Sequence, residues 1–152
     1  MNRRELAEEN FLKGYNCSQS VVLAFSDLLK EEEREMVLKI SSGFGGGFSR
    51  LREVCGAVSG MVIIADALYG YTGPEKGEIK KEHYERIQFL AKAYEEKCGS
   101  YICRDLLGLR VRREEATPEK RTESYYKKRP CKNLCGTAAE ILEDFIKKNP
   151  IN

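Results

Sequence analysis

The sequence predicts an all-α protein, a single-domain helical bundle around a central apolar helix. Apolar residues recur every three or four positions along most of the chain, which is the spacing of one helix face. Glycine and proline mark the ends of these segments. In no segment do apolar and polar residues alternate, as they would in a half-buried strand. Because 152 residues is a usual length for one domain, we expect residues 1–152 to form a single helical domain.

The first part of the chain is predicted to form three helices, at residues 4–14, 17–30 and 32–41. Gly14 ends the first helix because glycine interrupts a helix and tolerates the turn that follows it. Asn16 is a good N-cap for the second helix, since its side chain can accept a hydrogen bond from a free backbone N–H group.

A fourth helix is predicted over residues 51–69, and it is apolar almost all round. A helix of this kind usually lies at the centre of a bundle. It follows residues 43–48, whose sequence Gly-Phe-Gly-Gly-Gly-Phe predicts a loop with no helix.

The second half of the chain contains a long amphipathic helix at residues 78–97, which we expect to end at Gly99. Ser100 can cap a short helix that runs to Leu107. Residues 110–129 are highly charged, with a plausible helix start at Thr117-Pro118. The last helix is predicted over residues 130–148, because Pro130 suits the first position of a helix.

Composition narrows the classes of function. The formal charge of +2 is too small to indicate nucleic-acid binding, and the longest apolar run, near residues 61–68, is too short to span a membrane. His83 is the only histidine, which disfavours His-based zinc sites, haem with two His ligands and Cys-His proteases. No apolar leader is visible at the N-terminus, so we expect the cytoplasm, where cysteines usually bind metal, catalyse or sense redox state.

Six cysteines are the main functional signal, and four of them fall near predicted helix starts: Cys17, Cys55, Cys103 and Cys131. A helix N-terminus carries partial positive charge and free N–H groups, which favour the reactive thiolate. No pair has the CxxC spacing of a zinc ribbon or thioredoxin motif, so a shared site would have to be assembled from separate helices. We predict these four as catalytic residues or metal ligands. The alternative is that they are small hydrophobic residues of the core.

Other residues give weaker signals. Cys135 lies one helical turn from Cys131, and Cys98 lies just before the turn that leads to Cys103. Each of Cys98 and Cys135 could be a resolving thiol for its neighbour, or could lie near it by coincidence. The glycines do not complete a dinucleotide-binding motif, but they permit close approach of a ligand or another helix. We therefore predict Gly45, Gly46 and Gly47 as candidate cofactor-binding residues. His83 is expected to be exposed to solvent, and Asp66 is expected to face a gap or a basic partner.

Four stretches of the sequence together resemble the C_GCAxxG_C_C family, a bacterial and archaeal group to which redox activity has been ascribed. They are Asn16-Cys17-Ser18-Gln19-Ser20, then Gly43–Gly47 leading to Cys55-Gly56-Ala57-Val58-Ser59-Gly60, then Cys103-Arg104-Asp105-Leu106-Leu107-Gly108, and lastly Cys131 before Ala138-Ala139-Glu140-Ile141-Leu142. The resemblance implies that Cys17, Cys55, Cys103 and Cys131 are the family cysteines. It implies redox or metal chemistry without fixing a reaction.

The leading functional hypothesis is a cytoplasmic redox protein whose four cysteines converge beside the glycine loop. They would exchange between dithiol and disulfide, with Cys55 attacking because the glycine loop leaves it most open, or they would ligate zinc or an iron–sulfur cluster. The alternatives are a non-catalytic metal-binding structural module and an interaction protein with buried cysteines. We expect a redox partner, which the sequence does not identify, and no nucleic-acid or membrane partner. A homodimer is left open.

Overall fold

Helices make up the regular structure of this protein, as the sequence predicts. The computed structural model describes residues 1–74, 77–110 and 113–151. In these residues the only pairing of extended backbone is an isolated bridge between Val54 and Ile102. The elements are α1 (Arg3–Leu12), α2 (Cys17–Ala24), η1 (Ser26–Leu28), α3 (Glu31–Ile40), η2 (Ser41–Phe44), α4 (Gly45–Phe48), α5 (Gly56–Tyr69), α6 (Glu78–Cys98), α7 (Cys103–Leu107), α8 (Glu123–Lys128) and α9 (Cys131–Lys148).

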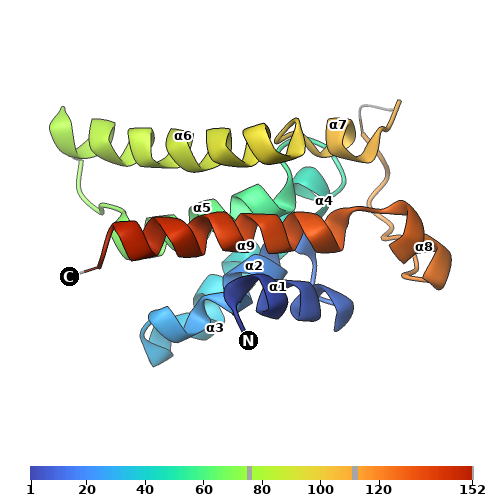
Figure 1. The fold of residues 1–152 in the computed structure, drawn as a ribbon, viewed down its shortest axis with the longest axis horizontal. Coiled ribbons are helices and arrows are strands. Elements are labelled where there is room, and N and C mark those ends of the chain that lie inside the picture. Colours follow the sequence, from blue (N-terminus) through green and yellow to red (C-terminus); the bar gives the residue numbers. More distant parts are fainter. Residues whose placement is uncertain (75–76, 111–112, 152) are drawn as a thin grey trace.

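The two long helices α6 and α9 run lengthwise through the molecule, and the N-terminal helices lie on the far side of α9 from α6 (Figure 1). Helix α1 packs against α2 and α9, while α5 contacts α2, α6 and α9. Their facing sides form one core of fully buried apolar side chains, the largest of which are Tyr94, Phe11, Phe25, Met61, Ile64, Leu90 and Leu142. Burial of these side chains supplies most of the stabilisation of the fold. In the described part of the chain, no helix has the length and apolar character needed to cross a membrane.

Helix α2 begins at the predicted place because Asn16 caps it. The side-chain oxygen of Asn16 accepts a hydrogen bond from the backbone N–H of Gln19 at 2.9 Å, and the Gln19 side chain accepts one from the backbone N–H of Asn16 at 3.2 Å. This reciprocal capping box satisfies two otherwise free donors. The helix is shorter than predicted, since it ends at Ala24 and a 3₁₀ turn follows. Helices α3, α6 and α9 agree with their predicted ranges to within one residue at each end.

The glycine-rich segment is a turn of left-handed helix rather than an irregular loop. Residues 46–50 all have positive φ, between 54° and 71°. The backbone N–H groups of Ser49 and Arg50 donate to the carbonyls four residues earlier, at 2.9 and 3.1 Å. We call residues 46–50 the left-handed turn. The helix predicted over residues 51–69 starts only at Gly56, because residues 51–55 are not helical and Arg52 also has a positive φ of 59°.

Two further predictions are wrong. His83 is buried rather than solvated, and its Nε2 lies 2.7 Å from the carboxylate of Asp66. Arg86 donates to Nδ1 of the same ring at 2.8 Å, so the Nε2 hydrogen faces Asp66. The other error concerns Thr117-Pro118, where no helix begins, because α8 starts at Glu123 and is capped by Thr122. Residues 111 and 112 of the charged segment 110–129 lie outside the described residues.

Candidate functional site

Four cysteines line one cavity at the end of the bundle where four helices begin. Cys17, Cys103 and Cys131 are the first residues of α2, α7 and α9, and Cys55 immediately precedes α5. All four contribute to the wall of a cavity of about 370 Å³, which we call the thiol cavity. The structure thus brings together side chains that are far apart in the sequence, and it places each at a helix N-terminus.

The glycines let the left-handed turn pack against these helix starts. A Cβ on Gly47 would lie 2.5 Å from the Cβ of Cys103, and one on Gly56 would lie 3.0 Å from the Cβ of Cys17. Neither position can hold a larger residue without displacing a cysteine. Of the three glycines predicted to bind a cofactor, Gly45 and Gly46 line the thiol cavity, whereas Gly47 is buried behind Cys103.

Backbone hydrogen bonds fix the start of α7 beside the start of α5. The N–H of Cys55 donates to the carbonyl of Tyr101 at 2.8 Å, and the N–H of Cys103 donates to the carbonyl of Glu53 at 2.6 Å. These two bonds surround the bridge between Val54 and Ile102. They hold Cys55 and Cys103 on neighbouring segments of the cavity wall.

Cys17, Cys131 and Cys135 form a close group of thiols. Hydrogen bonding to the Cys131 thiol lowers the pKa of Cys17, but hydrogen bonding to Cys135 and burial outweigh this effect, so the pKa of Cys17 is raised. Hydrogen bonding to Cys17, followed by burial, raises the pKa of Cys131. Cys135 is fully buried, and its sulfur lies 3.7 Å from the backbone oxygen of Cys17. The sequence relates Cys135 only to Cys131, whereas the fold also places it against Cys17.

The sequence suggested that Cys55 is the most open of the four cavity cysteines, but the structure shows that it is not. Its residue is only 3% exposed, whereas Cys17 is partly exposed. The sulfur of Cys55 lies 3.3 Å from the hydroxyl of the buried Tyr94. Burial raises the pKa of Cys55 to about 11, although the hydrogen bond with Tyr94 works in the opposite direction. At neutral pH Cys55 is therefore a thiol, which is the weakly nucleophilic form.

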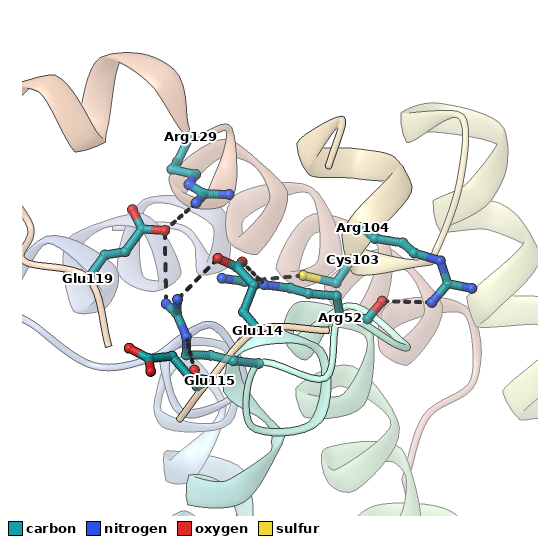
Figure 2. Close-up of polar contacts among 8 residues, drawn as sticks. Arg52, Cys103, Arg104, Glu114, Glu115, Glu119 and Arg129 are labelled. Carbon is teal, nitrogen blue, oxygen red and sulfur yellow. Dashed lines mark hydrogen bonds and ion pairs between the residues drawn. The ribbon is translucent and has the colours of Figure 1, made fainter. Parts of the chain in front are cut away.

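Cys103 lies beside Arg52, which follows the glycine-rich segment. Nη1 of Arg52 is 3.6 Å from the sulfur of Cys103, and both residues are buried (Figure 2). Burial raises the pKa of Cys103, while the hydrogen bond and positive charge of Arg52 oppose the rise. Cys103 is therefore the cavity thiol with a cation in direct contact with its sulfur.

A chain of ion pairs runs beside the thiol cavity (Figure 2). Glu114 accepts hydrogen bonds from Nε of Arg52 at 2.7 Å and from Nη2 of Arg50 at 3.3 Å. Glu119 pairs with Arg129. These glutamates belong to residues 113–122, which we call the covering segment because several of its side chains line the cavity: Ala116, Pro118, Glu119 and Arg121. The sequence shows the excess of charge here, but not which residues pair.

The donor set of four thiolates would suit zinc or an iron–sulfur cluster. In residues 1–74, 77–110 and 113–151, however, no group of three or more His, Cys, Asp or Glu side chains is arranged to hold a metal ion. Cys55 is hydrogen-bonded to Tyr94 and Cys103 to Arg52, so these two thiols have partners other than the Cys17 group. The arrangement does not support a shared metal position, and the ligand role of the four cysteines stays a prediction.

Comparison with family models connects this site to related sequences. Residues 15–145 match the family described as "Putative redox-active protein (C_GCAxxG_C_C)". The matched region contains every residue of the left-handed turn and all four cavity cysteines. No curated protein and no solved structure matches the chain. Because the family model covers most of the sequence, the resemblance is confirmed, and the chain belongs to the C_GCAxxG_C_C family.

Proposed function

We propose that this protein is a cytoplasmic thiol–disulfide redox protein in which Cys17 and Cys131 cycle between a dithiol and a disulfide. The observation that carries the proposal is that these two cysteines begin the contacting helices α2 and α9 in the wall of one cavity, where each affects the pKa of the other. The family's redox description supports the class of chemistry. A reducing compartment keeps such a pair available as a dithiol between turnovers.

Cys17 is the better attacking thiol of the pair. As a residue Cys17 is partly exposed, whereas Cys131 is buried, and we assign the attack to Cys17 on this ground. Cys135 and burial raise the pKa of Cys17 overall although Cys131 lowers it, so the choice of Cys17 rests on its exposure and not on its pKa. Cys131 then lies next to the mixed disulfide formed on Cys17, which is the position of a resolving thiol.

The reaction is a two-step thiol–disulfide exchange. The Cys17 thiolate attacks one sulfur of a substrate disulfide, the S–S bond breaks, and one substrate thiolate leaves. Cys131 loses its proton and attacks the sulfur of Cys17, which forms the Cys17–Cys131 disulfide and releases the second substrate thiolate. The two protons lost by the cysteines protonate the two substrate thiolates. The protein is oxidised by two electrons and the disulfide is reduced by two.

The test is a redox titration followed by alkylation and peptide mass spectrometry, which identifies each cysteine separately. In the wild-type protein we expect a reversible two-electron transition that joins Cys17 to Cys131. The variants Cys17→Ser and Cys131→Ser should abolish the transition. Cys98→Ser is the matched control, because Cys98 lies outside the thiol cavity, and it should leave the transition unchanged. A disulfide between other cysteines, or no transition in a folded wild-type protein, would refute the proposal.

A further inference from the structure

The wall of the thiol cavity is strongly positive. Its charged lining residues are Arg50, Arg52, Arg121, Arg129 and a single carboxylate, Glu119. The second carboxylate of the ion-pair chain, Glu114, is shared between Arg50 and Arg52. Together these residues are four guanidinium groups and two carboxylates, so the cavity carries an excess of positive charge.

Arg121 contributes to this excess because its partners are neutral. Its Nη1 donates to the backbone carbonyl of Phe11, and its Nη2 donates to that of Tyr15 at 2.8 Å. The guanidinium also lies over the ring of Phe11, 4.0 Å from the centroid. In residues 1–74, 77–110 and 113–151 these contacts hold the group in place without pairing its charge with a carboxylate.

The thiols do not supply the missing negative charge. The pKa values of Cys17, Cys103 and Cys131 are all raised, and that of Cys55 is raised to about 11. Each is therefore neutral at pH 7. The excess charge is free to act on a molecule that enters the cavity, where low-dielectric walls strengthen the attraction.

We propose that the substrate of the thiol cavity is a low-molecular-weight disulfide that carries carboxylate groups. This inference rests on the proposed function, to which it adds the class of substrate. The guanidinium groups of Arg121 and Arg129 would attract the carboxylates through their charge, although Arg129 also pairs with Glu119. The apolar part of the wall, from Leu106, Leu107 and Leu134, suits the carbon chain between carboxylate and sulfur. A cavity of about 370 Å³ accommodates a molecule of this size.

Three disulfides of nearly equal length provide the test: the dianion 3,3′-dithiodipropionate, the neutral bis(2-hydroxyethyl) disulfide and the dication cystamine. The rate at which each oxidises the reduced protein at pH 7.5 and low ionic strength is divided by its rate with 2-mercaptoethanol, which removes differences in intrinsic reactivity. After this correction we expect the dianion to react about tenfold faster than the dication, the lower end of the range for electrostatic steering. The preference should shrink as salt is added.

Arg129→Gln tests the residue assignment, and Lys132→Gln is the matched control. Both changes remove one positive charge near the start of α9, but only Arg129 lines the cavity. We expect Arg129→Gln to reduce the dianion preference several-fold. Because Arg129 also lowers the pKa of Cys131, the rates with all three disulfides should fall as well, and this common effect cancels in the ratio of dianion to dication rates. Lys132→Gln should alter neither. The neutral disulfide also reports whether the variant site is intact.

The possible outcomes separate this inference from the proposed function. Equal corrected rates for dianion and dication would overturn the assignment of an anionic substrate, and an undiminished preference in Arg129→Gln would overturn the role given to Arg129, while Cys17–Cys131 exchange still stands in both cases. Failure of all three disulfides to oxidise the Cys17–Cys131 pair would instead count against the proposed function itself.

Discussion

The hydroxyl of Tyr94 lies 3.3 Å from the sulfur of Cys55, and both side chains are buried. This contact joins α6 to the residue that immediately precedes α5. A buried hydroxyl needs a hydrogen-bond partner, and the thiol of Cys55 supplies one. A cysteine of the thiol cavity is in this way tied to the packing of the longest helix.

Replacement of Tyr94 by Phe is expected to lower the free energy of unfolding by about 1 kcal/mol. The ring and its packing are kept, so the loss is that of one buried hydrogen bond. Urea unfolding monitored by circular dichroism gives the difference. Tyr84→Phe serves as the control, because Tyr84 is exposed, and it should change stability by less than about 0.5 kcal/mol. An equal effect of the two substitutions would contradict the importance of the Cys55 contact.

Stability is expected to fall as pH rises from about 9 to about 11. Burial raises the folded-state pKa of Cys55 to about 11. The unfolded chain has an ordinary thiol pKa near 8.5. The neutral thiol therefore stabilises the fold fully below about pH 8.5, and this contribution is lost as the pH approaches the folded-state value. The loss should be of the order of 2 kcal/mol.

Urea midpoints measured under reducing conditions at pH 7.5, 9 and 10.5 test this expectation. Other buried groups also titrate in this range, so the relevant quantity is the difference between wild type and Cys55→Ala. We expect the decline to be shallower in Cys55→Ala, because the group that resists ionisation is absent. Parallel declines would show that Cys55 is not responsible.

Gly47→Ala is expected to be more destabilising than Gly108→Ala. Both glycines have positive φ, 69° and 65°, so both substitutions incur similar backbone strain, of about 1 kcal/mol. A Cβ on Gly47 would also meet the Cβ of Cys103 at 2.5 Å, whereas one on Gly108 would meet nothing within 4 Å. The clash should add about 1–3 kcal/mol, the usual cost of overpacking.

Thermal or urea unfolding of the two glycine variants measures this difference. Alkylation of Cys103, followed by mass spectrometry, reports whether its thiol is displaced. We expect the rate of Cys103 alkylation to change in Gly47→Ala and not in Gly108→Ala. Similar stabilities for both variants would mean that the left-handed turn moves away from α7 at little cost.

Arg52 and Glu114 are expected to stabilise the fold jointly. Arg52 is buried and its Nε lies 2.7 Å from the carboxylate of Glu114, whose side chain is 23% exposed. A double-mutant cycle with Arg52→Gln and Glu114→Gln should give a coupling energy of about 1–2 kcal/mol, more than an exposed pair supplies. The same cycle on the exposed pair Lys127 and Glu123 should give less than about 0.5 kcal/mol. A coupling energy this small between Arg52 and Glu114 would show that water screens their ion pair.

Local signals in the sequence were sufficient to predict most of the longer helices and the helix positions of the four cavity cysteines. Asn16 predicted the start of α2 because its capping bond involves only the next three residues. Gly99 predicted the end of α6 for a similar reason, and it adopts φ of 91° there. Such features depend on neighbours in the chain, which a single sequence displays.

Features that depend on distant partners were not predictable in this way. His83 lies among charged residues in the sequence, and only the packing of α6 on α5 brings Asp66 against it. The left-handed conformation of Phe48 and Ser49 goes against their local preference, so it must be imposed by contacts elsewhere in the fold. Arg52 and Glu114 lie 62 positions apart in the sequence, and no periodic pattern reveals their pairing.

Cys17 begins the second helix of the chain and Cys131 begins the last. A covalent bond between them would therefore enclose most of the polypeptide in a single ring of more than a hundred residues. Such a ring restricts the unfolded chain so strongly that, in the chain-entropy description, the oxidised protein should resist unfolding by roughly 4–5 kcal/mol more than the reduced one, apart from any strain. Removal of two electrons from this site would therefore raise the stability of the whole molecule, and their return would lower it.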